Sequence, residues 1–179
     1  MSMTPGAPID WAKAACDAVM AAYTPEELPP AGKWHYHQGV FLTGAVQVWE
    51  RTGDVRYFDY TKRYVDHLVD ELGNVVVAKG ELDAIQAGLL LFTLEDATGD
   101  SRYREAARKL RALFDTFNRT REGGFWHKDH YPYQMWLDGL YMGGVFAARY
   151  AARYGEPELV DMALHQERLM RRGTLRPDG

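Results

Sequence analysis

The sequence of 179 residues has very little cysteine: Cys16 is the single one. One thiol cannot form a disulfide within the chain, so nothing here requires an oxidising compartment. Basic residues are in the minority, since 21 Lys and Arg against 25 Asp and Glu give a net charge of −4 and a pI near 5.9. A nucleic-acid binder usually needs a positive field to neutralise phosphates, so that class is disfavoured.

Long apolar runs are also scarce. The longest weakly charged stretch, 131–148, contains Pro132, Gln134, Asp138 and three glycines, which makes it a poor membrane span. The first ten residues combine neither the basic region nor the apolar core of a secretory signal. We therefore expect a cytoplasmic protein that binds neither membranes nor nucleic acid. Hydrophobic residues make up 46% of the chain, and this length predicts one domain, 1–179, with a sizeable core.

What the sequence does contain is helical periodicity. Segments 57–72 and 103–117 carry apolar residues at helical spacing on one face and charged residues on the other. Segments 34–49, 82–94 and 131–148 contain almost no charge, as is typical of helices buried on most sides.

The fold class is therefore predicted to be all-α, with uncharged and amphipathic helices in alternation. The expected elements are a helix at about 9–23 and helical hairpins at about 34–71, 82–117 and 133–171. The single candidate strand, 74–78, is short.

The turns between the paired helices repeat. Thr52-Gly53-Asp54 recurs as Thr98-Gly99-Asp100, and Tyr154-Gly155-Glu156 is a looser third copy. Glycine suits the position after a helix end, and an acidic residue suits the start of the next helix. Such a repeat predicts stacked helical hairpins, either a solenoid or a toroid of inner and outer helices. The uncharged inner layer favours the toroid.

Two carboxylates interrupt the uncharged helices. Asp83 is the one charged residue in 82–94, Asp138 is the one in 131–148, and each is expected about one turn into its helix. A desolvated carboxylate needs a partner or a raised pKa, and two that face one pocket can divide into an acid and an ionised partner. The alternative is that each is a first-turn residue that compensates the helix dipole.

Aromatic and histidine residues gather at the same helix ends, in Trp34-His35-Tyr36-His37 and Gly124-Phe125-Trp126-His127-Lys128. Aromatic faces interleaved with hydrogen-bonding groups suit a sugar ring, although ordinary core packing would give the same pattern. His35 and His37 alternate, and no histidine or cysteine spacing supports zinc, so we expect neither a metal nor a cofactor.

These residues together resemble a known family. The shared motifs are Trp34-x-Tyr36-x-x-Gly39, Leu82-Asp83-x-Ile85-x-x-Gly88, Gly124-Phe125-Trp126-His127-Lys128 and Gln134-Met135-Trp136-Leu137-Asp138-Gly139-Leu140-Tyr141-Met142. They are similar to those of the unsaturated rhamnogalacturonyl hydrolases, glycoside hydrolase family 105, which is related to the unsaturated glucuronyl hydrolases of family 88. The resemblance implies an (α/α)6 barrel that removes a 4,5-unsaturated uronic acid from oligosaccharides made by polysaccharide lyases.

The resemblance also implies roles for single residues. Asp138 would be the general acid and base, protonating C4 of the vinyl ether and helping water to add at C5. Asp83 would be the second carboxylate, positioning substrate or water and raising the pKa of Asp138 by like charge. The residues that the resemblance places around the substrate are Tyr36, His127, Lys128, Trp136 and Met142. The family mechanism uses no metal.

The expected helices make up about half of such a barrel, and an arginine that binds the uronate carboxylate in the family would lie beyond Gly179. A half-barrel leaves an apolar edge, so we expect either a homodimer or a C-terminal half that covers it. Two other functions stay open. One is a non-catalytic helical-repeat binding or scaffold protein, and the other is a different (α/α)6 sugar enzyme such as an epimerase.

Overall fold

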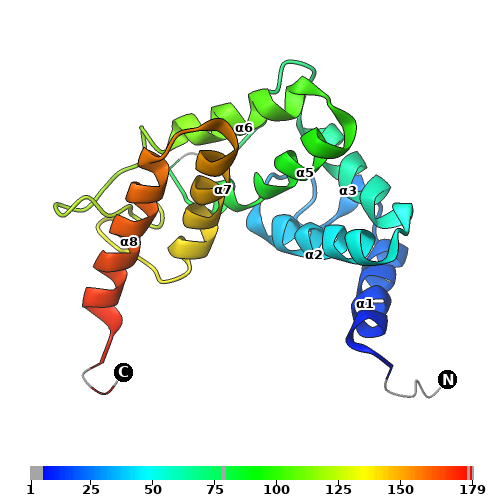
Figure 1. Cartoon of the computed structure of the whole chain (residues 1–179), viewed down its shortest axis with the longest axis horizontal. Helices are drawn as coiled ribbons and strands as arrows, with labels where there is room; N and C mark the ends of the chain where they lie inside the picture. Colours follow the sequence, from blue (N-terminus) through cyan, green and yellow to red (C-terminus); the bar gives the residue numbers. More distant parts are fainter. Residues whose placement is uncertain (1–5, 78–79, 177, 179) are drawn as a thin grey trace.

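A computed structural model describes residues 6–77, 80–176 and 178 of the chain. Figure 1 shows an arch of helices with α1 (Pro8–Ala22) at one end and α8 (Glu158–Thr174) at the other. In these ranges the β structure is limited to four isolated bridges, and no helix is long and apolar enough to cross a membrane. The all-α prediction is therefore confirmed.

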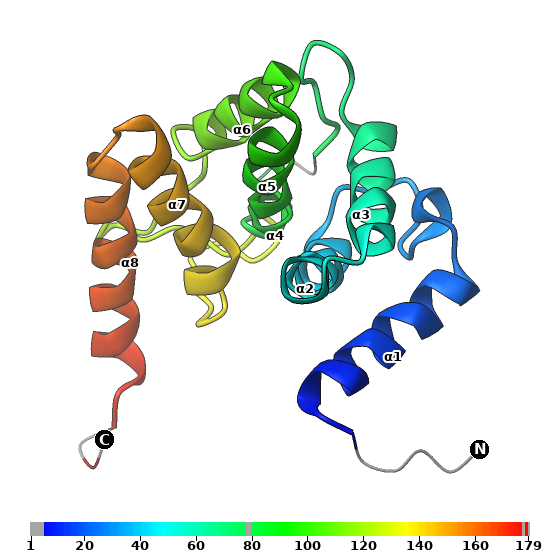
Figure 2. The ribbon, with the colours of Figure 1, turned by 45° about the vertical axis from the view of Figure 1, so that its right-hand side comes forward.

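The helices form two layers along the arch. The inner layer consists of α2 (Tyr36–Thr52), α4 (Asp83–Gln86), α5 (Leu89–Thr98) and α7 (Val145–Tyr154). The outer layer consists of α3 (Val55–Leu68), α6 (Ser101–Leu113) and α8. In each hairpin an inner helix packs on the outer helix that follows it: α2 on α3, α5 on α6 and α7 on α8, as Figures 1 and 2 show. The predicted helical hairpins are thus present.

The repeated turns have the geometry that their residues predict. Gly53, Gly99 and Gly155 end their helices with φ of 73°, 71° and 78°, in the left-handed region that glycine adopts without steric cost. The side chains of Asp54 and Asp100 each cap the next helix by accepting a hydrogen bond from a backbone N–H two residues on. These local signals fix where each hairpin turns.

The core lies between the two layers. The apolar faces of the amphipathic helices point inward, so that Tyr57 and Tyr64 of α3 and Tyr103 of α6 are buried. Phe146 of the inner layer stacks on Phe92, with ring centroids 5.2 Å apart. Burying each such side chain contributes roughly 1.5–3 kcal/mol. This packing holds the inner helices at fixed positions, and their ends carry the candidate site.

Two expected inner helices differ from the prediction. Segment 82–94 divides into α4 and α5 at Gly88, where an added Cβ would lie 2.7 Å from the ring of Phe146. Segment 131–148 is irregular up to the π-helix η2 (Leu140–Gly144), after which α7 follows. Pro132 and the positive φ of Tyr133, 65°, keep the start of this segment out of a helix. The third hairpin therefore begins later than 133, and Asp138 precedes its helix.

The short candidate strand at 74–78 does not form a strand within the described residues. Val75 forms one bridge with Val69, and Val77 forms one with Trp34. Ala78 lies outside the residues that the structure describes. The segment instead leads the chain from the first hairpin toward α4.

Candidate active site

Asp83 is the most deeply buried acidic group of the site. It is the first residue of α4, and the residue is 2% exposed. Lys128 Nζ lies 2.6 Å from Oδ2 of Asp83, and His127 Nε2 lies 3.3 Å from its Oδ1. His35 Nε2 is 4.0 Å from Oδ2. A carboxylate without water is stable only when it is paired, and Lys128 supplies the pairing charge.

The lysine remains charged at this position. Burial alone would lower the pKa of Lys128, but the hydrogen bond to Asp83 and the charges of Asp83 and Glu81 outweigh it, so the pKa lies above its ordinary value. Glu81 Oε2 is 3.5 Å from Lys128 Nζ. The structure therefore commits Lys128 to two carboxylates of its own chain.

Backbone hydrogen bonds bring the second half of the site to Asp83. The loop after Gly124 runs beside residues 80–82: Leu82 N donates to His127 O at 3.0 Å, and Asp129 N donates to Gly80 O at 2.7 Å. His127 N in turn donates to Gln134 O at 2.8 Å. The loop is thus fixed on both sides of His127, and its side chain is held next to Asp83.

Asp138 is the accessible acid of the site. It lies in the turn before η2, where its carbonyl accepts hydrogen bonds from Tyr141 N and Met142 N at 2.8 Å. Its side chain is 46% exposed, and its Oδ1 lies 3.6 Å from His127 Nδ1. The structure brings the two predicted carboxylates to one place, but with the buried ring of His127 between them.

An aromatic stack borders this cluster. The Trp136 ring lies parallel to the His127 ring, with centroids 4.2 Å apart and planes 6° apart. Tyr131 stacks with Trp136 at 5.2 Å. Trp136 is 39% exposed, so part of the residue is open to solvent. An exposed aromatic side chain is the kind of surface on which the C–H side of a sugar ring can lie.

The two remaining predicted contacts lie further back. Tyr36 begins α2, and its half-buried ring stacks on His37 with centroids 4.1 Å apart and lies tilted against His35 at 4.6 Å. Met142 is part of the hydrophobic core and is 7% exposed. Their roles as substrate contacts stay predictions. Tyr36 contacts His35, which in turn faces Asp83, and Met142 packs in the core under the site.

The structure adds two polar residues, His35 and Gln86, that the sequence did not assign to the site. His35 faces Asp83, and its pKa is lowered, chiefly by burial and then by the charge of His37. Gln86 is fully buried, and its Nε2 donates to Tyr141 Oη at 3.2 Å. Gln86 follows Asp83 by three residues, a spacing that places both on one face of a helix and could have indicated it.

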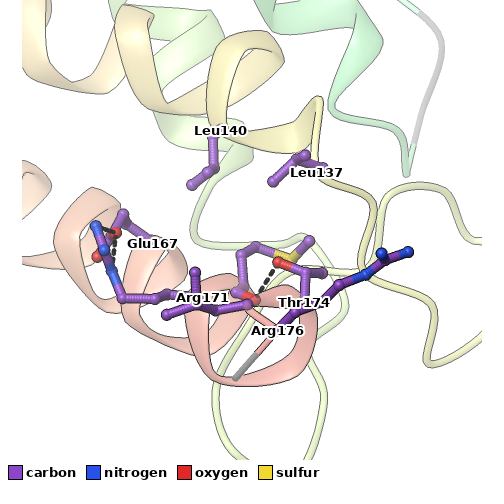
Figure 3. Close-up of a pocket in the computed structure, with 8 residues that line it drawn as sticks. Leu137, Leu140, Glu167, Arg171, Thr174 and Arg176 are labelled. Atoms are coloured by element: carbon purple, nitrogen blue, oxygen red, sulfur yellow. Dashed lines mark hydrogen bonds and ion pairs between the residues drawn. The ribbon is translucent and has the colours of Figure 1, made fainter. Parts of the chain in front are cut away.

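Two cavities lie near the cluster. One of 510 Å³ separates Leu137 and Leu140 from the C-terminal end of α8, where Figure 3 shows Arg171 paired with Glu167 of the same helix. Two of its lining residues, Leu137 and Leu140, are close to Asp138 in the sequence, but neither Asp83 nor Asp138 lines this cavity. The other, of 360 Å³, is lined by Gly32, Lys33, Trp34, His35, Val76, Val77 and Glu81. Of the residues around Asp83, it includes His35 and Glu81.

Asp83, His127 and Asp138 have possible metal-ligand atoms within 4.8 Å of one another. The arrangement does not suit a cation. The Lys128 ammonium already occupies Oδ2 of Asp83, and the two nitrogens of His127 face two different carboxylates. The group is better described as a cluster of acidic and basic side chains in contact.

A curved double layer of helices, with an acidic and aromatic cluster at the ends of its inner helices, defines a class: the helical-toroid proteins. Comparison with known proteins narrows this class. The sequence profile described as Glycosyl Hydrolase Family 88 matches residues 11–178, and the chain belongs to that family.

Individual relatives agree with this family. An unsaturated rhamnogalacturonyl hydrolase of Bacillus subtilis, YesR, is 26% identical over 122 residues, which are 65% of this chain and 34% of that protein. A family 105 glycoside hydrolase of C. acetobutylicum is 34% identical, with a TM-score of 0.82 over 90% of this chain and 45% of that one. A Klebsiella pneumoniae protein described as a possible member of the same family shares the fold, with a TM-score of 0.77 at 18% identity, over 99% of this chain and 51% of that one.

The chain thus spans about a third of the length of the curated relative and about half of the solved structures that it matches. The helical hairpins correspond to about half of an (α/α)6 barrel, as the family resemblance implies.

Proposed function

We propose that this chain carries the acid–base centre of a glycosidase that removes a 4,5-unsaturated galacturonyl or glucuronyl residue from lyase-generated, pectin-type oligosaccharides. The family supports a glycoside hydrolase, and the name of the Bacillus relative supports an unsaturated uronide as the substrate. The observation that carries the proposal is the different environment of the two carboxylates: Asp138 is half exposed, whereas Asp83 is buried and paired with Lys128.

In this proposal Asp138 acts twice. As an acid it gives its proton to C4, and the electron pair of the C4–C5 double bond forms the new C–H bond. The positive charge that develops is shared by C5 and the ring oxygen. A water molecule then bonds to C5 and returns one proton to the Asp138 carboxylate. The product is a hemiketal, which opens and releases the rest of the oligosaccharide, so that the anomeric carbon is never attacked.

The other residues hold this centre in place. Trp136 offers its exposed part to the sugar ring, and Tyr36 and Met142 form the more distant wall. Asp83 forms an ion pair with Lys128 and faces Nε2 of His127. We therefore assign Asp83 and Lys128 the role of holding the His127 ring in position. The repulsion between Asp83 and Asp138 is weakened because the Lys128 ammonium neutralises the former.

The test is an activity assay with an unsaturated galacturonyl-rhamnose disaccharide, in which hydration of the double bond removes its ultraviolet absorbance. We expect the chain to remove the absorbance and Asp138→Asn to lose this activity by at least about 100-fold, as is usual when a general acid is removed. Asp161→Asn on the exposed face of α8 is the control and should keep full activity. Equal rates for the chain and Asp138→Asn would contradict the assignment and favour a binding or scaffold role.

A further inference from the structure

His127 is a buried base that the proposed reaction does not use directly. The residue is 1% exposed, and each ring nitrogen faces a different carboxylate: Nε2 faces Asp83 Oδ1 at 3.3 Å, and Nδ1 faces Asp138 Oδ1 at 3.6 Å. His127 Nδ1 and Asp83 Oδ1 are both buried without an aligned hydrogen-bond partner. Catalytic hydrogen bonds are often long in a substrate-free enzyme and shorten in the complex, so these two contacts are the ones available to satisfy both atoms.

The charge on Asp83 determines which nitrogen carries the proton. Asp83 is held ionised by Lys128, whose ammonium lies 2.6 Å from it. An ionised carboxylate can only accept hydrogen bonds, so Nε2 of the neutral imidazole must be the N–H. Nδ1 is then left with a lone pair directed toward Asp138. An acceptor at this place favours the protonated form of the Asp138 carboxyl, which is the form that a general acid needs.

The ring cannot easily leave this orientation. Its backbone is tied to Leu82 and Gln134, and the parallel face of Trp136 covers one side of the ring at 4.2 Å. The same aromatic face stabilises a positive charge on the imidazole whenever Nδ1 takes the proton. Both positions of the proton, on Asp138 and on His127, are therefore supported by fixed neighbours.

We propose that Asp138 and His127 share one proton, held between Asp138 Oδ1 and His127 Nδ1, and that Asp83 fixes the histidine tautomer that makes this sharing work. The inference rests on the proposed function for its consequence in catalysis, but not for the shared proton itself. His127 is a positioning residue in this scheme, because it acts on the substrate through Asp138. The proton goes from Asp138 to C4 and is replaced from the water that bonds to C5, so His127 is neutral before and after the reaction.

Several charged and titratable groups surround the imidazole of His127. Those that face the cluster are Asp83, Glu81, Lys128, Asp138 and His35. Strongly interacting groups titrate as a set, so the observable is the change that one substitution makes to the titration of His127.

The test is ¹⁵N NMR of the histidine rings across a pH titration, without substrate. We expect His127 to carry its proton on Nε2 when neutral, and its titration midpoint to fall by at least about one pH unit in Asp138→Asn, where the amide N–H can donate to Nδ1 and no charge favours the imidazolium. The internal reference is His165 in α8, whose Nε2 lies 2.7 Å from the carbonyl oxygen of Glu122. The matched control variant is Asp161→Asn. Asp138 is half exposed, so this variant is expected to fold.

An unchanged midpoint of His127 in Asp138→Asn, or a neutral ring protonated on Nδ1, would overturn the proposal whatever the enzyme does. A kinetic arm adds the link to function: His127→Gln should lower kcat more than it raises KM, and should shift the limb of the pH profile that reports Asp138. If no substrate is turned over at all while the NMR result holds, the proposed function fails and the shared proton stands.

Discussion

Glu95 joins three helices through one carboxylate. It lies in α5 with its side chain 5% exposed, and its Oε1 accepts a hydrogen bond from Arg104 Nε of α6 at 2.7 Å. Its Oε2 accepts from Arg153 Nε at 2.8 Å and from the hydroxyl of Tyr154, both in α7. The second hairpin is thereby tied to the third, so replacing Glu95 tests how firmly the arch is held.

The loss of stability expected for Glu95→Gln depends on how exposed Arg104 and Arg153 are. Removing one partner of a fully buried ion pair costs about 3–5 kcal/mol, but exposed pairs contribute about 1 kcal/mol or less. The Arg104 side chain is 61% exposed and that of Arg153 is 27% exposed, so water can solvate both once the carboxylate is gone. We therefore expect Glu95→Gln to lower the free energy of unfolding by about 2–3 kcal/mol. At about 2–4 °C per kcal/mol for a chain of this size, Tm should fall by about 5–10 °C.

The effect should depend on pH. Burial alone would raise the pKa of Glu95, but hydrogen bonds from Tyr154, Arg104 and Arg153 outweigh it, so the pKa lies below its ordinary value of 4.5. A carboxyl whose pKa is lower in the folded state stabilises the fold above the pKa of the unfolded chain. This stabilisation is lost as pH falls through the folded-state value. The difference between the chain and Glu95→Gln should therefore be largest near neutral pH and shrink below about pH 4.5.

Urea unfolding followed by circular dichroism, at neutral pH and at about pH 4, measures both quantities. The control is Asp96→Asn, because Asp96 pairs with the same Arg153 at 2.7 Å but is 65% exposed. It should cost at most about 1 kcal/mol. If Glu95→Gln lowers the free energy of unfolding no more than this control, or if its effect grows as the pH falls, Glu95 does not tie the hairpins together as an ionised carboxylate.

Two further substitutions test the site and the repeat. Gly39→Ala should destabilise the chain by about 1–3 kcal/mol, because the new Cβ would lie 2.0 Å from Gln86 Oε1 and 2.7 Å from Ala87 Cα. Urea unfolding measures this loss, and an unchanged stability would show that Gln86 and Ala87 can move away from the new Cβ. Asp100→Ala removes the side chain that accepts from Arg102 N at 2.9 Å, and should cost about 1 kcal/mol of helix-cap energy, whereas an unchanged unfolding midpoint would contradict the capping role.

The repeat and the fold class could be predicted because their signals are local. Gly53, Gly99 and Gly155 each need the left-handed conformation, and each therefore marks a helix end in the sequence as clearly as in the structure. The acidic residue after the first two of these glycines caps the next helix through its own side chain. Uncharged and amphipathic segments then assign the helices to the inner and outer layers.

The geometry of the site could be predicted only in part. Asp83 and Asp138 do meet, but the sequence does not show that His127 separates them, because its position depends on backbone hydrogen bonds to Leu82 and Gln134 across an irregular loop. The same loop delays the third inner helix, so Asp138 lies in a turn instead of inside a helix. Periodicity describes helices well, and it carries no information on the path of a loop.

Delivery of a proton from Asp138 to C4 of an unsaturated uronide can be followed directly with deuterium. The reaction is run with the disaccharide in D2O, and the released uronic acid is examined by NMR at early times. We expect one deuterium on C4 in the product of the unaltered chain and no such product with Asp138→Asn. A released sugar that still carries its double bond, with no deuterium on C4, would show attack at the anomeric carbon and exclude proton delivery to C4.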